Sequence, residues 1–375
     1  RPDRQYPFFI GFPIKPYFDR TTLRTRVTPD VHIFEQEQGF FNVSTTIRMT
    51  VIKLQSTGGL WVHAPVAPTE ECIRLVSELG PVEHIVLPVT AVEHKAFIGP
   101  FSRKFPEAKV WICPGQWSFP INLPLNFRVD GVLCEDRAPW QDEIDCKLFR
   151  PPLAGVGESN EAVFFHRSSK TLLVTDSLIC VPREPPAIIP VADLLLAAAP
   201  DDAGAPATPV EDTPTARRRG WAKMALQILF LGPARPETFD LLAERLICSP
   251  VVRELVLSRV LPTVRTFVDD VTSGDWQFKQ VIPAHFAAPV RAGPKEFRRA
   301  YAFAFAGAEK KGKMRKTGMA AAGSGGGGDG GMLRWFGGGG GGGVTVDDLA
   351  AVPEEDLATL RFIKALTDKA GLARS

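Results

Sequence analysis

"VEHIVLPVTAVEHKAFIGPF", residues 82–101, joins a short apolar run to a segment of helical character through the acid–histidine pair Glu93-His94. A similar apolar run, LWVHAPV (60–66), precedes it, and AKVWICP (108–114) follows it. Between the first two runs lies PTEECIRLVSEL, in which Thr69 is a suitable N-cap residue. Strands and helices that alternate at this spacing need right-handed crossovers, so they predict a partly parallel sheet covered by helices.

Further strand-like segments lie on both sides of this unit. Upstream, VHIFEQ (31–36) and TTIRMTVIKL (45–54) alternate apolar and polar residues, as half-buried strands do. Downstream, AVFFH and TLLV flank the turn-like RSSK (167–170), a pattern typical of a hairpin. Together the segments predict two sheets with helices outside them. The expected fold class is therefore α/β, an αββα sandwich.

Composition suggests how the main domain is divided. Residues 1–30 read as an N-terminal extension, and residues 31–306 as the main domain. Within the main domain, the Ala-, Pro- and Asp-rich stretch at about 197–219 is expected to be a disordered insertion. The segment at about 220–271 has helical spacing, which predicts an inserted helical block.

The end of the chain has a different character. Two glycine runs mark residues 307–344 as a low-complexity linker. Helical periodicity returns in residues 345–375, where apolar residues form one broad face. We expect a C-terminal helix that docks on the main domain.

Overall composition excludes several classes of protein. A hydrophobic content of 45% with 23% charged residues is typical of a soluble globular chain, and the net charge of +2 gives no reason to expect nucleic acid as a partner. No apolar run reaches the roughly 18 residues that a membrane-spanning helix needs. The six cysteines include no CxxC pair, which argues against a thiolate zinc site and favours a reducing compartment. Because the sequence begins at Arg1, a removed targeting segment is one hypothesis.

Strand ends supply the candidate site residues. His94 and His285 each follow an apolar strand, in IVLPVTAVEH and VIPAH, and Asp176 has the same placement in TLLVTDSL. Ligand groups converge at the carboxyl ends of strands in α/β proteins. Two imidazoles with the carboxylates of Asp176 and Glu93 make a credible metal-binding set. For each residue alone, the alternative is a structural role as a helix cap or turn residue.

The other four histidines can be assigned by strand phase. His32 and His166 are expected to be surface or structural residues, and His84, which begins its strand, is expected to be solvated. His63 lies inside a short buried strand, so it is expected to be a core histidine with satisfied hydrogen bonds.

The order of these segments resembles the metallo-β-lactamase fold. More narrowly, LPVTAVEHKAFIGPFSRKFPEAKVWICPGQWSFP (87–120) and VIPAHFAAP (281–289) resemble an uncharacterised domain-of-unknown-function family of plants, algae and cyanobacteria related to that fold. The resemblance covers most of residues 31–305. It implies the αββα sandwich and a location in a plastid (chloroplast), and the local patterns add the inserted helical block and the C-terminal helix to this fold.

The superfamily binds metal through an HxHxDH motif, followed by a later histidine, a bridging aspartate and a final histidine. On this chain Val89 and Ala91 fall where the first two histidines of the motif stand. Glu93 falls on its aspartate and His94 on its last histidine. The later histidine should lie in PPLAGVGESNEAV (151–163), which contains none. The resemblance therefore implies that one of two metal sites has lost its histidines.

The second metal site is retained in this alignment. Asp176 matches the bridging aspartate and His285 the final histidine. With His94, and with Glu93 as a further carboxylate, they could hold one Zn²⁺ or Fe²⁺ ion and leave a position open for water. Glu93 has one methylene more than the aspartate it replaces, so it could instead act as a general base or orient a ligand.

The lost site sets the functional expectation. Two cations acidify the bridging water of the dinuclear enzymes, so a chain with one ion or none is not expected to be a conventional dinuclear hydrolase. The first hypothesis is a degenerate metallo-β-lactamase-fold protein that acts as a binding or assembly module. The alternative is a mononuclear metal-dependent hydrolase of an ester, thioester or phosphoester, with Glu93 and Asp176 as its catalytic carboxylates. The sequence does not identify the small-molecule or protein partner, or the oligomeric state.

Overall fold

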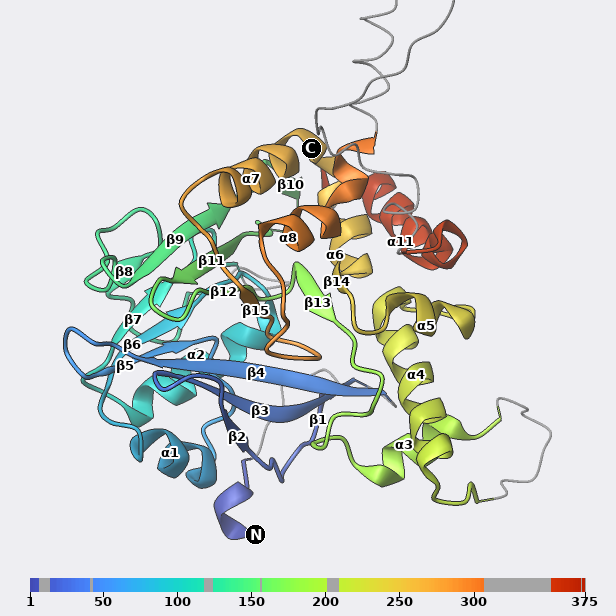
Figure 1. Cartoon of the computed structure of the whole chain (residues 1–375), viewed down its shortest axis with the longest axis horizontal. Helices are drawn as coiled ribbons and strands as arrows, with labels where there is room; N and C mark the ends of the chain where they lie inside the picture. Colours follow the sequence, from blue (N-terminus) through green and yellow to red (C-terminus); the bar gives the residue numbers. More distant parts are fainter. Residues whose placement is uncertain are drawn as a thin grey trace, which may run out of the picture.

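The computed structural model describes residues 1–6, 14–40, 43–117, 124–155, 157–200, 209–306, 352–371 and 373–374. Its largest sheet has the strand order β1-β3-β4-β5-β6-β7-β8, with β2 paired to β3 (Figure 1). The strands of this first sheet are β1 (Ile14–Lys15), β2 (Leu23–Arg26), β3 (Val31–Phe40), β4 (Val43–Lys53), β5 (Leu60–His63), β6 (Val82–Leu87), β7 (Lys109–Ile112) and β8 (Gly131–Val132).

The alternating strand–helix unit is confirmed in this first sheet. Strands β5 to β8 pair in parallel, whereas β1 to β5 pair antiparallel. Helix α1 (Glu70–Ser77) connects β5 to β6, and helix α2 (Val92–Lys104) connects β6 to β7. The Thr69 hydroxyl caps α1 by accepting a hydrogen bond from the Cys72 N–H at 3.1 Å, as its position predicted.

A second sheet has the strand order β15-β12-β11-β9. The expected hairpin is present, since Phe164 of β11 pairs antiparallel with Leu173 of β12. Two small two-stranded sheets, β13–β14 and β10–β16, lie outside it. The strands are β9 (Ile144–Phe149), β10 (Ala154–Gly155), β11 (Glu161–His166), β12 (Thr171–Leu173), β13 (Leu178–Cys180), β14 (Leu246–Cys248), β15 (Gln280–Ile282) and β16 (Ala373–Arg374).

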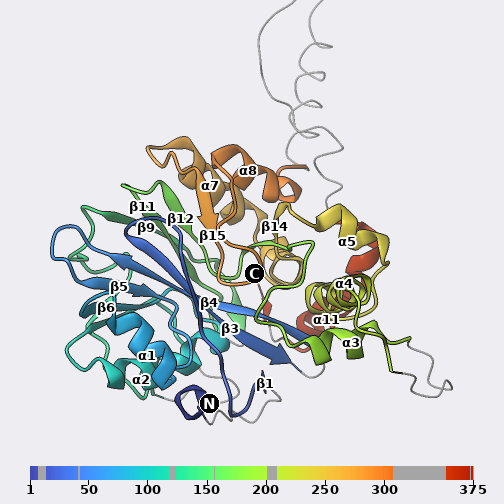
Figure 2. The same ribbon diagram turned by 60° about the horizontal axis from the view of Figure 1, so that its bottom comes forward.

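Apolar side chains join the two sheets face to face. Trp61 and Trp111 of the first sheet pack with Phe164 of the second, and Trp140 fills the space between them. On the outer face of the first sheet lie α1 and α2. On the outer face of the second lie α7 (Leu261–Ser273) and α8 (Pro294–Ala300). Figure 2 shows these layers in order, from α1 and α2 through the strands of the two sheets to α7 and α8, which confirms the α/β class and the αββα sandwich.

A block of helices lies at one end of the sandwich, where Figure 2 shows α3 to α5 beside α11. It contains α3 (Val191–Ala198), α4 (Pro214–Phe230), α5 (Glu237–Leu242) and α6 (Pro250–Leu255). Helix α4 begins earlier than the expected residue 220, because Thr213 caps it through the Ala216 N–H and proline occupies its first position. Residues 201–208 of the expected insertion lie outside the described residues. No helix in the described part has the length and apolar character needed to span a bilayer.

The C-terminal segment contributes α11 (Ala358–Lys369), which packs against α6. Leu357 and Leu360 are buried in the apolar core of the helical block. Arg259 joins Asp368, and the Lys364 ammonium donates to the Ser258 hydroxyl at 2.7 Å. The glycine-rich stretch expected at 307–344 lies outside the described residues.

Candidate metal centre

Glu93 and His94 lie where α2 begins, just after β6 leaves the first sheet. Ala91 is the N-cap residue of α2 and its side chain makes no capping hydrogen bond. The acid and the imidazole both lie in the first turn of the helix. His94 is fully buried and Glu93 is half-buried. The acid is favourably placed, because the positive end of the helix dipole attracts a carboxylate.

Asp176 lies in the loop between β12 and β13, and Glu161 of β11 holds this loop. The Glu161 carboxylate accepts hydrogen bonds from the Thr175 N–H at 2.7 Å and the Ser177 N–H at 3.0 Å. It also accepts one from the Ser177 hydroxyl at 3.1 Å. Burial, assisted by the charge of Asp176, raises the pKa of Glu161 to about 7. Glu161 therefore fixes the backbone on both sides of Asp176.

His285 follows β15 and is oriented by β4. Its Nδ1 lies 2.7 Å from the Thr46 carbonyl oxygen, which can only accept a hydrogen bond, so Nδ1 carries the proton. The buried Arg48 guanidinium donates to the carbonyls of Pro283 and Phe286, on either side of His285. These contacts fix the ring of His285 with Nε2 directed at Asp176.

The imidazoles of His94 and His285 converge on one carboxylate oxygen of Asp176. His94 Nε2 lies 3.1 Å from Asp176 Oδ1, and His285 Nε2 lies 3.2 Å from the same oxygen. Each of these residues and Glu93 offers one ligand atom, and the four atoms lie within 4.8 Å of one another. Burial opposes ionisation of Asp176, but His94 and His285 hold its pKa well below the usual range. Burial lowers and Asp176 raises the pKa of His94, and the net shift is upward.

The donor set fits a transition metal ion. In a neutral ring, His285 Nε2 has a lone pair, and the ionised Asp176 oxygen 3.2 Å away is also an acceptor. Two acceptors facing each other at this distance repel unless a proton or a metal ion lies between them. Two imidazole nitrogens with one or two carboxylate oxygens are ligands that Zn²⁺ and Fe²⁺ accept. His94 Nδ1 is buried and has no hydrogen-bond partner within the described residues.

The structure thus brings together Glu93, His94, Asp176 and His285, all four of the residues singled out from the sequence. They come from both sheets, since β6 precedes α2 in the first sheet whereas β12 and β15 lie in the second. Within the described ranges, this is the one group of three or more such side chains with metal-binding geometry.

Sequence reasoning missed two polar residues next to the site, Arg48 and Glu161, and was wrong about the hydrogen bonds of a third, His63. Arg48 lies in a strand that was expected to be half-buried, and Glu161 was given no role, yet both are buried. A carboxylate at the start of the mainly apolar strand EAVFFH was the available signal for Glu161. His63, expected to be a satisfied core residue, is in the core, but its Nε2 has no hydrogen-bond partner in the described part of the chain.

Among the other histidines, the solvated assignment of His84 is wrong. His84 is 8% exposed and its ring lies 4.7 Å from that of Trp140, because this tryptophan covers the edge of the core. His166 is structural, as one reading of its position held. It is buried, and its Nδ1 lies 2.7 Å from the Ser169 hydroxyl.

His63 should make the fold sensitive to acid. Burial, with a contribution from His94, lowers the pKa of His63 to about 3, whereas an unfolded histidine titrates near 6.5. Only the unfolded chain then takes up this proton between those values, so stability present above about pH 6.5 is lost as the pH falls. We expect His63→Leu to reduce the slope of the unfolding free energy between pH 6 and pH 4 by roughly 1.4 kcal/mol per pH unit. Denaturant titrations in chelator check this, and equal slopes for both chains would contradict it.

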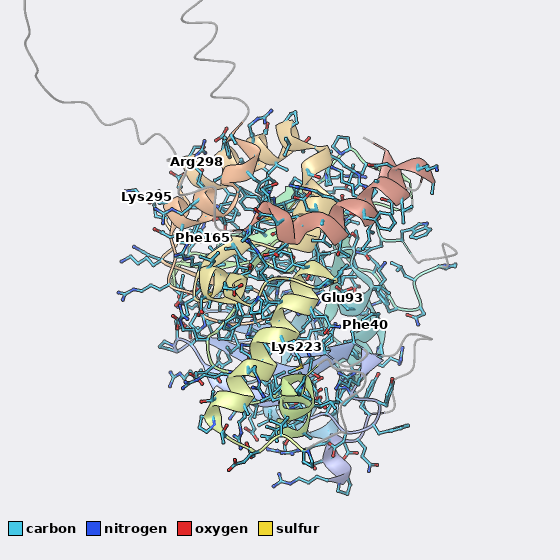
Figure 3. The ribbon with its side chains drawn as sticks, turned by 90° about the vertical axis from the view of Figure 1, so that its right-hand side faces the viewer. Phe40, Glu93, Phe165, Lys223, Lys295 and Arg298 are labelled. Atoms are coloured by element: carbon cyan, nitrogen blue, oxygen red, sulfur yellow. The ribbon has the colours of Figure 1, made fainter. Side chains whose placement is uncertain are left out.

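Two cavities meet at Glu93 and Asp176. The first, of about 400 Å³, is lined mainly by the apolar residues Phe40, Val43, Val92, Ile179, Ile228 and Phe286. In Figure 3, Glu93 and Phe40 lie next to each other beside the ribbon of α4. The second, of about 290 Å³, adds the carboxylates of Glu158 and Glu161. Neither cavity has a lysine or arginine among its described lining residues. Hollows of about 450 and 590 Å³ lie elsewhere and include none of the four residues.

Comparison with protein families gives one match over most of the chain. The family model described as "Domain of unknown function (DUF4336)" matches residues 29–242 and 234–303. No curated protein matches the chain.

Solved structures with a similar fold share little sequence with this chain. The flavodiiron core of Flv1 from Synechocystis sp. PCC6803 has 10% identity and a TM-score of 0.41, and the match covers 76% of this chain and 61% of that one. A putative diflavin flavoprotein A 5 fragment from Nostoc sp. PCC 7120 has 9% identity and a TM-score of 0.43, with coverages of 78% and 99%. A metallo-beta-lactamase from Pontibacter korlensis has 11% identity and a TM-score of 0.37, with coverages of 75% and 98%. The strand order and packed layers, and not these low scores, establish the sandwich.

Proposed function

The chain belongs to the family described as Domain of unknown function (DUF4336), and we propose that it is a mononuclear metal-dependent hydrolase of an ester or thioester with an apolar acyl group. The proposed ion is Zn²⁺ or Fe²⁺, held by His94, Asp176 and His285 with Glu93 beside them. One observation carries the proposal: two imidazole Nε2 atoms converge on Asp176 Oδ1 at the wall of an apolar cavity.

A single ion is proposed because the positions for a second ligand set hold no donor side chains. Val89 is apolar and buried, and its backbone pairs with that of Glu161. Ala91 is the N-cap residue of α2 and has only a methyl group to offer. The superfamily motif, by comparison, would place histidines at both positions. This loss is the sense in which we regard the site as degenerate.

The roles of the side chains follow from where they lie. A bound ion would supply Lewis-acid activation of water and of the substrate carbonyl. Glu93 lines both cavities at the start of α2, where it can accept the proton of the attacking water and pass it to the leaving oxygen or sulfur. Thr46 keeps the His285 proton on Nδ1, and Glu161 holds the loop that carries Asp176. These contacts fix the ligands before any substrate arrives.

The lining of the cavities favours an uncharged acyl substrate over a phosphoester. The apolar cavity offers Phe40, Val43 and Phe286 to a hydrocarbon chain. The adjoining cavity is rich in carboxylates, which would repel a phosphate dianion. Phosphate sites in proteins typically present arginine, lysine or backbone N–H groups, and the described lining residues here include neither arginine nor lysine.

A non-catalytic binding or assembly module is the second candidate, and one observation favours it. Asp176 Oδ1 lies within hydrogen-bond distance of both imidazoles, so protonated rings could satisfy the cluster without a metal ion. The cavity of about 400 Å³ beside the cluster weighs against a pure assembly module, whereas turnover of a substrate separates the hydrolase from a ligand-binding module. We also propose a location in a plastid, on the sequence resemblance alone, and imaging of the tagged protein in cells would test it.

Metal analysis combined with an ester assay tests the proposal. We expect natively purified chain to hold about one equivalent of zinc or iron and no more. Hydrolysis of a medium-chain nitrophenyl ester or acyl thioester should be lost after dialysis against a chelator and return with Zn²⁺ or Fe²⁺. A nitrophenyl phosphate serves as the matched control substrate and should not be hydrolysed. Two tightly held ions would contradict the single site, and full turnover in chelator would contradict a metal-dependent reaction.

A further inference from the structure

Two cysteines outside the candidate metal centre face each other across the edges of the two sheets. Cys134 follows β8, the last strand in the order of the first sheet, and Cys146 lies in β9, the last strand of the second. Their Sγ atoms are 2.6 Å apart, and the residues are 12 positions apart in the sequence. The two sulfurs therefore meet where the open edges of the sandwich come together.

The turn that carries Cys134 holds its sulfur in this position. Cys134 has a φ of +62°, in the left-handed region that a residue other than glycine seldom adopts. The Asp136 carboxylate accepts a hydrogen bond from the Val132 N–H at 2.7 Å, and the Asp136 N–H donates to the Val132 carbonyl at 3.0 Å. These two hydrogen bonds join the residues on either side of Cys134 and fix the conformation of the turn. A bond between the two sulfurs therefore needs little backbone movement.

The pair differs from the other cysteines in access, and Cys134 alone also differs in acidity. Cys134 is exposed and Cys146 is half-buried, whereas Cys72, Cys113, Cys180 and Cys248 are buried. A hydrogen bond from Cys146 lowers the pKa of the Cys134 thiol. The hydrogen bond with Cys134, with burial, raises the pKa of the Cys146 thiol. Burial raises the pKa of each of the four buried thiols. Because the thiolate is the reactive form, Cys134 is the thiol that an oxidant meets first.

We propose that Cys134 and Cys146 form a reversible disulfide that joins the edges of the two sheets. The oxidant is a small-molecule disulfide such as oxidised glutathione. The Cys134 thiolate attacks one of its sulfurs, forms a mixed disulfide and releases one glutathione thiolate. The Cys146 thiol then loses its proton to solvent, attacks the Cys134 sulfur and releases the second thiolate. Two thiols of the chain are thereby oxidised, and one external disulfide is reduced to two thiols.

The crosslink should be visible as a gain in thermal stability. A disulfide restricts the unfolded chain, and its two sulfurs here already lie together in the folded one. For a short closed loop in a chain of this size, we expect the melting temperature to rise by about 5 °C on oxidation. In a reducing compartment the pair would rest as two thiols and close only under oxidising conditions.

Intact mass and peptide mapping of the full chain test the proposal. After incubation with oxidised glutathione, the wild-type chain should lose the mass of two hydrogen atoms and yield one peptide pair linked through Cys134 and Cys146. Reduced glutathione should reverse both changes. Cys134→Ser and Cys146→Ser should abolish the link and the rise in melting temperature, whereas Cys113→Ala, which removes a neighbouring buried thiol, should keep both. The proposal is overturned if both thiols stay open to alkylation in oxidised glutathione, if only mixed disulfides with glutathione accumulate, or if the link joins two chains. Mapping the wild-type chain decides these outcomes even where a variant fails to fold.

Discussion

Replacing His285 with alanine should reduce the affinity for Zn²⁺ or Fe²⁺ by at least about 100-fold and abolish hydrolysis with it. Removing a residue that merely orients a ligand weakens metal binding by about 10- to 100-fold, so loss of a ligand should exceed that range. His285 Nε2 lies 3.2 Å from Asp176 Oδ1. Among the described residues, His94 is the one other histidine that pairs with this oxygen. His94→Ala should have the same effect, since its Nε2 lies 3.1 Å from the same atom. Metal content by elemental analysis and ester turnover should fall together.

His32→Ala is the matched control for these variants. It also removes one imidazole, but from β3, where the residue pairs with Val51 and lies outside the metal-binding group. Metal content and turnover should therefore match those of the wild-type chain. If His285→Ala and His94→Ala leave metal content, turnover and the melting temperature in chelator unchanged, the four side chains form only a hydrogen-bonded cluster. That result would favour the binding or assembly module.

The sequence predicts which residues form this site, but local patterns do not predict how these residues come together. The ends of the strands could be predicted from the sequence, and the four polar residues that follow them form the metal-binding group. The alternation of apolar and polar residues along each strand does not predict why these four residues lie close together. Glu93 and His94 follow a strand of the first sheet, whereas Asp176 and His285 follow strands of the second, so their convergence depends on how the two sheets pack. The resemblance to a known fold supplied that packing, whereas local pattern did not.

The residues that support the site were missed for a different reason. Alternation in TTIRMTVIKL predicts one apolar face and one polar face, and it was read as a half-buried strand. All of β4 except Lys53 is buried, because α4 and the loop that carries His285 cover its polar face. A polar face that lines a buried site has the same sequence pattern as one that faces water. The structure distinguishes these two kinds of polar face, because the Thr46 carbonyl contacts His285 and Arg48 donates to the Pro283 carbonyl.

Arg48→Met should destabilise the fold by about 3 kcal/mol and weaken metal binding by roughly 10- to 100-fold. Arg48 is 1% exposed, pairs with Glu35, and donates hydrogen bonds to the carbonyls of Pro283 and Phe286. Methionine fills much of the same volume but donates no hydrogen bond, so both buried carbonyls lose this donor. They flank His285, so the imidazole should lose part of its fixed orientation. Denaturant unfolding in chelator measures the first effect, and metal titration of the folded protein measures the second.

Two further variants separate the role of Arg48 from a general loss of charge. Arg48→Lys keeps the charge but not the planar fork that reaches two carbonyls at once, so it should restore only part of the stability and of the metal affinity. Arg24→Met removes a more exposed arginine, paired with Glu78 at 2.8 Å on the surface, and should change stability by less than about 1 kcal/mol and metal affinity not at all. If Arg48→Met lowers stability but leaves metal affinity at the wild-type value, Arg48 supports the core alone. The orientation of His285 would then depend on the Thr46 carbonyl, because that contact comes from the same strand and would survive the substitution.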